Sequence, residues 1–173
     1  VRQPKVLHES TRFITGYRAE AEKHHCTMRT RVLELKVQTA DAHVAAALGL
    51  SEKEKVTRLT RLRHLEGTSN EAPVLYTTVF VPHSLFPDME TLDFTDLSFY
   101  DILAQRNMDV RRAVRRLEVM MPPSEVSAAL GITPFEPCVF ISSTGYTASG
   151  AAIEYAESYY PASSSSFLIE VNR

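Results

Sequence analysis

The sequence lacks any apolar run approaching the roughly 20 residues needed to cross a bilayer, which argues against a membrane span. It has few cysteines. Cys26 and Cys138 show no patterned spacing, which excludes a disulfide framework and is typical of a protein in a reducing cytosol. Its first ten residues are polar, so we expect no signal peptide there. Basic residues are not in excess either. The net charge is −2 and the pI is near 6.3, so we expect this chain to bind no DNA by itself.

A recognisable catalytic set is also missing. The sequence contains no G-x-S-x-G, no H-E-x-x-H, no Walker loop and no glycine-rich nucleotide turn, and its histidines are scattered. His24, His25 and Cys26 are candidate metal ligands. Adjacent side chains point in different directions, however, and zinc ligands are usually spaced more widely, so we interpret this segment as a helix end and a turn. We therefore expect no metal, no cofactor and no catalysis, with an enzyme kept as the alternative.

What the sequence does contain is the pattern of one domain that mixes helices and strands. Its 173 residues are enough for a single core, and 44% of them are hydrophobic. Alternating apolar residues predict strands, and capped apolar stretches predict short helices. The expected strands cover residues 31–37, 56–65, 74–82, 110–121, 139–160 (as a hairpin) and 167–171. The expected helices cover residues 15–23, 42–48, 99–106 and 124–131.

Two segments of the chain echo each other. AHVAAALGLS at residues 42–51 is similar to SEVSAALGIT at residues 124–133. Each segment follows a strand and precedes a hairpin, so the order strand, short helix, strand, turn, strand occurs twice. Hairpins imply antiparallel pairing. Two such units predict an α+β fold, with one antiparallel sheet and helices packed on it.

The hairpin VFISSTGYTASGAAIEYAESYY at residues 139–160 carries the first candidate site residues. We expect Gly145 and Ser149-Gly150 to be its turn residues. Side chains alternate between faces along a strand, so Glu154 and Tyr160 share one face with only small residues between them. A carboxylate and a phenol with only small side chains between them could border a shallow ligand-binding hollow. A solvated sheet face is the other interpretation that this strand leaves open.

A second candidate group combines two arginines with a helix start. Arg61 and Arg63 lie two residues apart in a strand and share a face, where forked guanidinium donors suit a phosphate or carboxylate. Ser98 is a predicted N-cap, and Asp101 completes a capping signature. A helix start offers free N–H groups to an anion, to which Ser98 and Tyr100 add hydroxyls. Solvated arginines, a plain cap and a packing tyrosine remain the alternative interpretation.

The segment DVRRAVRRLEV is a predicted basic strand. Its arginines point to both faces, so about half would face away from any one partner. We therefore interpret it as an exposed or edge strand, where charge discourages pairing with other chains, rather than as a nucleic-acid site. Its four arginines are Arg111, Arg112, Arg115 and Arg116.

Together these residues resemble a known family: the effector-sensing UTRA domain of GntR-family bacterial transcription regulators, in the HutC subfamily. The resemblance spans about residue 12 to the C-terminus and rests on the order and spacing of its motifs. It implies a chorismate-lyase-like α+β fold, a ligand pocket and a winged helix on the N-terminal side. On this basis residues 1–11 are expected to be a linker from a missing winged-helix domain, and residues 12–173 the effector-binding domain. The motifs are Leu48-Gly49, Arg61–Arg63, Pro73, Ser98–Tyr100, Ala129–Gly131, Gly150–Tyr155 and Tyr160.

The resemblance also implies which residues bind the effector. In members that sense sugar phosphates, an R-x-R strand, a serine and tyrosine at a helix start, and a glutamate and tyrosine in the last hairpin form the pocket. In this sequence those positions are Arg61, Arg63, Ser98, Tyr100, Glu154 and Tyr160. A residue of the N-terminal helix contributes in the family as well, and Arg18 or a neighbour matches it only in a loose register.

The chain departs from the family pattern at two places, Thr147-Ala148-Ser149 before the hairpin glycine and Pro161-Ala162-Ser163 after the last tyrosine. These departures concern the organic part of the ligand more than its anion. The resemblance thus implies a homodimer that binds a small anionic metabolite, a sugar phosphate or carboxylate, and passes that event to an attached DNA-binding domain. An enzyme on the same scaffold and a dimerisation domain with a degenerate pocket are the alternatives.

Overall fold

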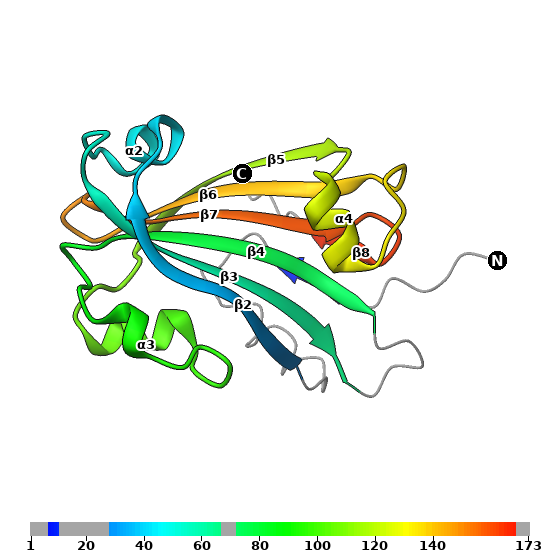
Figure 1. Ribbon diagram of the computed structural model, residues 1–173, viewed down its shortest axis with the longest axis horizontal. Coiled ribbons are helices and arrows are strands. Elements are labelled where there is room, and N and C mark those ends of the chain that lie inside the picture. Colours follow the sequence, from blue (N-terminus) through cyan, green and yellow to red (C-terminus); the bar gives the residue numbers. More distant parts are fainter. Residues whose placement is uncertain (1–6, 11–27, 67–71, 169–173) are drawn as a thin grey trace, which may run out of the picture.

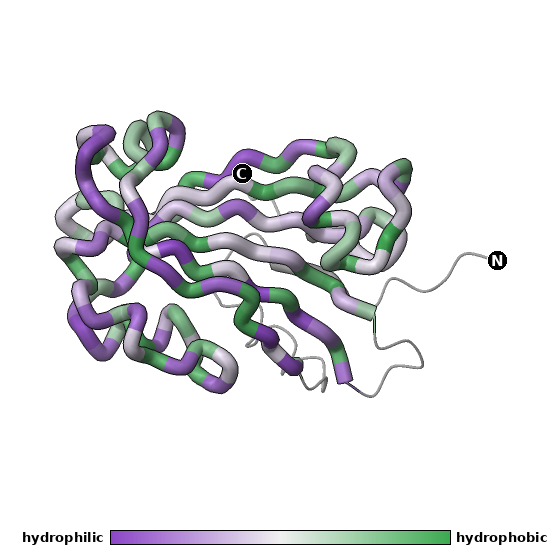
Figure 2. Tube along the Cα trace, in the orientation of Figure 1, coloured by the Kyte–Doolittle hydropathy of each residue, from purple (hydrophilic) through white to green (hydrophobic). Residues whose placement is uncertain are grey.

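The computed structural model describes residues 7–10, 28–66 and 72–168 (Figure 1). Six of its strands form one antiparallel sheet in the order β2-β3-β4-β7-β6-β5, so the predicted α+β class is confirmed. Along β2 and β3 hydrophilic and hydrophobic residues alternate (Figure 2), as expected for strands whose two faces meet different surroundings. The strands are β2 (Met28–Thr39), β3 (Lys55–Leu65), β4 (Pro73–Pro82), β5 (Arg112–Met120), β6 (Cys138–Tyr146) and β7 (Ala152–Pro161).

A second, two-stranded sheet joins β1 (Leu7–Ser10) to β8 (Ser165–Leu168) in parallel. Four residues of the segment expected to be a linker are therefore paired with the last strand. The expected strand 167–171 begins two residues earlier than predicted, and residues 169–171 lie outside the described part. The expected helix 15–23, Arg18 and the His24-His25-Cys26 segment also lie outside it.

Three short helices follow the predicted caps closely. In α2 (Ala42–Leu48) the Asp41 carboxylate accepts the Val44 N–H at 2.8 Å, and Gly49 ends the helix with φ of 66°. In α3 (Phe99–Gln105) the Ser98 hydroxyl accepts the Asp101 N–H at 3.5 Å. The third helix, α4 (Ser124–Leu130), follows two prolines and ends at a left-handed glycine. None of the helices in the described part has the length and apolarity that a membrane span requires.

The sequence echo becomes a structural repeat with exchanged helices. The units β2-α2-β3-β4 and β5-α4-β6-β7 meet at the central pair of β4 and β7. Helix α2 packs on β7, where its apolar residues contact Phe80 and Tyr155, and α4 packs on β4, beside Leu62 and Tyr76. Each half of the sheet is therefore covered on this face by the helix of the other half.

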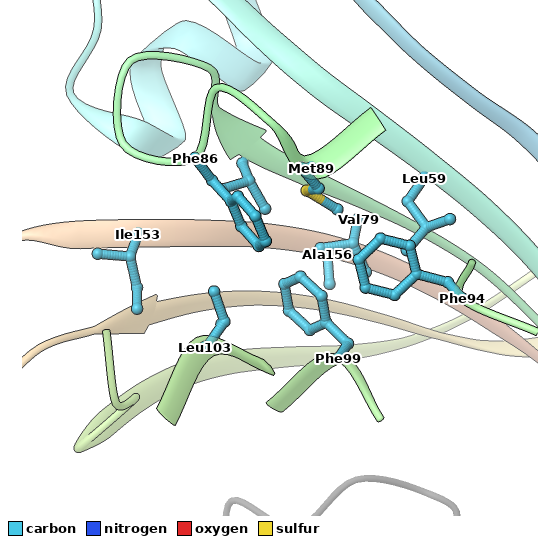
Figure 3. Packing of buried hydrophobic residues seen from close by; sticks show 10 residues of the cluster. Leu59, Val79, Phe86, Met89, Phe94, Phe99, Leu103, Ile153 and Ala156 are labelled. Carbon is cyan, nitrogen blue, oxygen red and sulfur yellow. The ribbon is translucent and has the colours of Figure 1, made fainter. Parts of the chain in front are cut away.

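The opposite face of the sheet packs against α3 and the segment before it, which includes the short 3-10 helix η1 (Met89–Thr91). Figure 3 shows Phe99 and Leu103 of α3 pointing at Val79 and Ala156 of the central strands. Val79, Phe99 and Ala156 of this core also line a cavity between α3 and the sheet.

The basic strand lies where the sequence placed it, because β5 is at one edge of the sheet and most of its side chains are exposed. Arg111 lies just before the strand and donates its N–H to the Tyr146 carbonyl at 2.8 Å. Cys138 is buried, as expected, and burial raises its thiol pKa to about 11. In the described residues no three potential metal ligands come together.

We expect Leu103→Ala to lower the free energy of unfolding by about 2–5 kcal/mol, because Leu103 is fully buried between α3 and the sheet. Chemical denaturation followed by circular dichroism measures this. Leu85→Ala is the matched control, since Leu85 is 46% exposed and should change stability by about 0.5 kcal/mol at most. Equal effects at the two positions would mean that α3 does not pack as described.

Candidate functional site

A cavity of about 80 Å³ lies between the sheet and the start of α3. Since a water molecule occupies about 30 Å³, this volume suits a compact group such as a phosphate or carboxylate. Arginines and hydroxyls line it beside apolar side chains. The lining residues are Thr30, Arg61, Arg63, Leu75, Thr77, Val79, Leu97, Ser98, Phe99, Tyr100, Arg115, Ile141, Ser143, Ala156, Ser158 and Tyr160.

Arg61 dominates the electrostatics of the cavity. Its side chain is only 4% exposed, and its Nε has no hydrogen-bond partner in the described part of the chain. Burial, together with the neighbouring Arg63 guanidinium, lowers the Arg61 pKa to about 9, so the group still carries its charge at neutral pH. The Phe99 ring, 5.9 Å from the guanidinium carbon, gives only a weak cation–π contact. The site therefore holds a buried cation whose Nε atom has no hydrogen-bond partner among the described residues, and whose nearest acidic influence is the partly ionised Glu154.

Ser98 and Tyr100 reach the cavity from the first turn of α3. The Ser98 hydroxyl caps the helix and also lines the cavity. Tyr100 lines the cavity too, but its hydroxyl donates to Oε1 of Glu154 at 2.9 Å. Tyr160 lines the cavity from β7, and its ring lies edge-on to Phe167 at 5.1 Å.

Glu154 lies behind Tyr100 and is not among the lining residues. It is 1% exposed, and Oε2 has no hydrogen-bond partner in the described residues. Burial raises its pKa to about 7, although the Tyr100 hydrogen bond and the charges of Arg115 and Arg61 act in the opposite direction. Five of the six predicted site residues thus border the cavity, and the sixth is joined to it through Tyr100.

Gly145 corrects one prediction. It is not a turn residue: it lies inside β6, opposite Glu154, and the turn comes later, at Gly150 with φ of 86°. A Cβ atom at position 145 would come within 2.7 Å of both Cγ and Oε1 of Glu154. Gly145 is therefore where it is because the buried glutamate needs the space.

Sequence reasoning missed five polar residues of the cavity, Thr30, Thr77, Ser158 and the pair Arg115 and Ser143, of which the last two are the most informative. These two face each other across β5 and β6, and Ser143 in turn faces Ala156 of β7. The Ser143 hydroxyl is buried without a hydrogen-bond partner in the described residues. Alternation along the basic strand already put some arginines on each face. Only the pairing of β5 with β6 determines that Arg115 points to the cavity.

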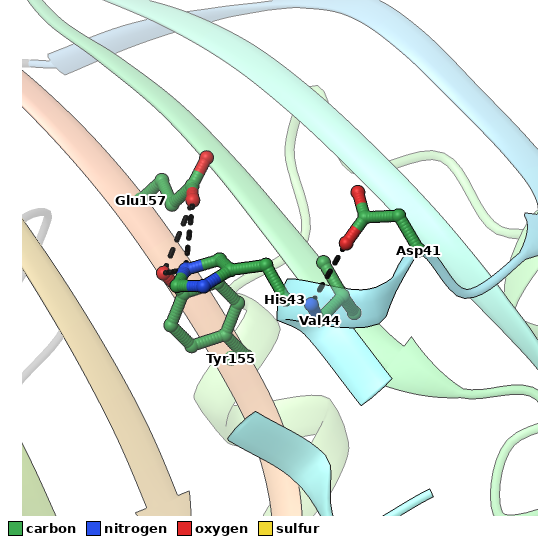
Figure 4. Close-up of polar contacts among 5 residues, drawn as sticks. All are labelled: Asp41, His43, Val44, Tyr155 and Glu157. Carbon is green, nitrogen blue, oxygen red and sulfur yellow. Dashed lines mark hydrogen bonds and ion pairs between the residues drawn. The ribbon is translucent and has the colours of Figure 1, made fainter. Parts of the chain in front are cut away.

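Two other features were compared with this cavity. A larger hollow of about 410 Å³ lies between residues 107–111 and 147–153, but mostly exposed loop side chains line it. On the other face of the sheet, Figure 4 shows His43 Nε2 2.7 Å from the Tyr155 hydroxyl, which donates to Glu157 at 3.0 Å. These side chains hydrogen-bond to one another and so connect α2 to β7. The arginine-lined cavity is therefore the candidate functional site.

Comparison with protein families agrees with the fold described above. A family model described as the UTRA domain matches residues 23–165. The mannosyl-D-glycerate transport/metabolism system repressor MngR of Escherichia coli (strain K12) is 22% identical over 147 residues, which cover 85% of this chain and 60% of the relative. The chain thus spans about 60% of the length of that curated relative.

Solved structures share the fold. PhnF from Mycobacterium smegmatis superposes with a TM-score of 0.88 at 20% identity, over 98% of this chain and 73% of PhnF. Its effector domain alone gives a TM-score of 0.84 at 21% identity, over 91% of this chain and 95% of that domain. The C-terminal domain of the histidine utilization repressor from Pseudomonas syringae pv. tomato gives 0.75 at 22% identity, over 84% and 99% of the two chains.

We expect Gly145→Ala to lower the free energy of unfolding by about 1–3 kcal/mol, because the added methyl collides with Glu154. Thermal and chemical denaturation measure the change. Ser142→Ala, a half-buried position on the other face of β6, should alter stability by about 0.5 kcal/mol or less.

The double variant Gly145→Ala/Glu154→Ala separates collision from other effects. With the glutamate removed, the extra cost of the alanine at position 145 should largely vanish. A cost that persists unchanged in the double variant would contradict this account of the glycine.

Proposed function

The chain belongs to the UTRA domain family, the ligand-binding effector domains of GntR-family transcription regulators, and from this premise we propose that its arginine-lined cavity binds a small anionic metabolite. Regulators of this family are not enzymes, so the expectation that the chain does not catalyse a reaction is confirmed and the enzyme alternative is set aside. We propose further that the parent regulator is of the HutC subfamily and carries a winged-helix DNA-binding domain on the N-terminal side of this chain.

The observation that carries the proposal is the buried Arg61, whose Nε atom has no hydrogen-bond partner among the described residues. Burying a charged group is costly unless it is paired and hydrogen-bonded. The neighbouring Arg63 increases this cost through like-charge repulsion. A ligand anion relieves both effects at once, since two guanidinium groups on one strand face offer forked donors to phosphate or carboxylate oxygens.

The remaining site residues divide by the side of the cavity they occupy. Arg61 and Arg63 lie on β3, next to Ser98 at the start of α3. Across the sheet, Arg115 and Ser143 approach from β5 and β6, and Tyr160 from β7. We propose that the first group holds the anion and that the second group meets the organic part of the ligand.

The ligand class we propose is a sugar phosphate or a sugar carboxylate. The Escherichia coli relative supports this class, because it is the repressor of a system for mannosyl-D-glycerate, a sugar derivative that carries a carboxylate. Removing Arg61 therefore tests the anion site directly.

We also propose how ligand binding reaches the attached domain. Tyr160 borders the cavity and contacts Phe167 of β8, and β8 pairs with β1 near the N-terminal end of the chain. A ligand that moves Tyr160 therefore acts on β1 through a single ring contact and one strand pair. Such a ligand shifts operator binding only as far as its affinity differs between the two arrangements of the regulator.

We expect Arg61→Met to weaken binding of phosphate- or carboxylate-bearing sugars by about ten- to a hundredfold, the scale of one charged hydrogen bond. The same change should stabilise the empty domain by about 1–3 kcal/mol, because it removes a buried charge. Calorimetry with a panel of sugar phosphates and dicarboxylates measures the first effect, and denaturation without ligand the second.

Arg116→Ala is the matched control for both measurements, since Arg116 is an exposed arginine whose strand neighbour Arg115 faces the cavity. Its affinities should stay within about twofold of the unmodified chain. An effector that proves uncharged, or that binds the Arg61→Met variant as tightly as the unmodified chain, would refute the proposed anion site.

We propose that the domain is a homodimer, because regulators that read two half-sites match the two-fold symmetry of their operators. Multi-angle light scattering should give about twice the 19.4 kDa mass of one chain. A single-chain mass at every concentration up to the solubility limit would count against the dimer and leave the anion site untouched.

A further inference from the structure

Tyr100 stands between the cavity and the buried Glu154. Tyr100 lines the cavity, and its hydroxyl donates its single hydrogen to Oε1 of Glu154, a residue outside the cavity lining, at 2.9 Å. A phenol has one hydrogen to donate. While Glu154 is ionised, Tyr100 can therefore offer an anion in the cavity only its oxygen lone pairs. In this arrangement the tyrosine opposes the ligand that the arginines attract.

Protonation of Glu154 reverses the hydrogen bond. A neutral carboxyl has one O–H donor, which can point at the Tyr100 oxygen and free the phenol hydrogen to turn to the cavity. The glutamate is well placed to change its charge. Burial raises its pKa to about 7, and the second carboxylate oxygen has no hydrogen-bond partner in the described residues.

The groups around Glu154 come from four other elements and from the segment before β5. Arg61 on β3, Arg115 on β5 and Tyr100 on α3 are the titratable groups that act on it, and the two arginines favour its ionised form. Gly145 on β6 and the Val110 side chain close off the remaining space. An anion bound by Arg61 would screen the positive charge of that arginine from Glu154 and add a negative charge of its own. Both effects favour the neutral carboxyl.

We propose that anion binding in this cavity is coupled to uptake of one proton by Glu154: the carboxyl donates its hydrogen to the Tyr100 oxygen, and Tyr100 donates its own hydrogen to the bound anion. The proton comes from solvent, and no covalent bond other than O–H bonds forms or breaks. Glu154 is then a positioning residue that acts through Tyr100, not a direct ligand contact. This inference rests on the proposed anion-binding function of the same cavity.

The expected pH dependence follows from this coupling. Below the pKa of the empty site Glu154 is already neutral, so affinity is independent of pH. Above it, each anion that binds brings in one proton, and affinity falls by about tenfold for each pH unit until the pKa of the occupied site is reached. The affinity should therefore decline as the pH rises above about 7.

Sulfate is the probe that tests the coupling, because it stays a dianion across neutral pH and cannot supply the proton itself. Calorimetric titration with sulfate between about pH 6 and 8, where Arg61 with its pKa of about 9 stays protonated, gives the number of protons taken up when it is repeated in two buffers with different ionisation enthalpies. For the unmodified chain this number should rise toward one above neutral pH. Affinity that is independent of pH, with no proton uptake, would overturn the coupling.

Glu154→Gln tests the relay independently. The glutamine amide donates permanently to the Tyr100 oxygen, so at pH 8 sulfate should bind without proton uptake and about tenfold more tightly than to the unmodified chain. Glu157→Gln, on the same strand but on the opposite face, is the matched control and should keep the full pH dependence. Retained proton uptake in Glu154→Gln would assign the proton to another group and overturn the proposal.

The anion site and the proton relay can be tested separately. Sulfate binding that depends on Arg61 but not on pH would leave the anion site standing and remove the relay. Absence of sulfate binding to the unmodified chain at every pH would contradict the anion site, and the relay with it. Since proton uptake is measured on the unmodified chain, the test does not depend on a variant that folds.

Discussion

A guanidinium buried inside a protein with part of its hydrogen-bonding capacity unused is unfavourable, and the site of this domain is organised around one, Arg61. Arg61 stays charged because even a strongly lowered pKa leaves it protonated at neutral pH. The surrounding fold bears that cost through the core that α3 forms with the sheet, where Phe99 and Leu103 hold the helix above the strands. The packing that stabilises the domain therefore also maintains a binding site that is unfavourable when empty, a trade-off expected where affinity is needed.

Much of the fold was predictable because its signals are local. Asp41 and Gly49 mark the ends of α2, and alternation identified the strands of both hairpins. The candidate site was partly predictable for the same reason. The spacing of Arg61 and Arg63 fixes their common face, and a serine before an apolar turn marks the start of α3.

What escaped prediction depends on contacts between strands. Gly145 looks like a turn residue under any local rule, yet the reason for it is Glu154 on the neighbouring strand. Arg115 is one of several arginines in its segment, and only its register with Ser143 turns it to the cavity. The burial of Glu154 likewise results from α3, whose tyrosine covers the end of the strand. Spacing made this glutamate a candidate, but did not reveal that it lies behind another residue.

The internal repeat bears on why the two sides of the cavity differ chemically. Arg61 follows Gly49 at the same spacing as Ser143 follows Gly131, and Arg63 corresponds in this way to Gly145. At these two pairs of positions the repeat therefore carries cations in the first copy and small residues in the second. The segment 83–111, which contains α3, follows the first copy, whereas a three-residue turn and β8 follow the second. The asymmetry of the site thus comes from a few different side chains at equivalent positions and from the unrepeated segment 83–111. A domain built on this repeat can change the ligand it recognises through substitutions at those positions and in segment 83–111, while the repeated framework stays the same.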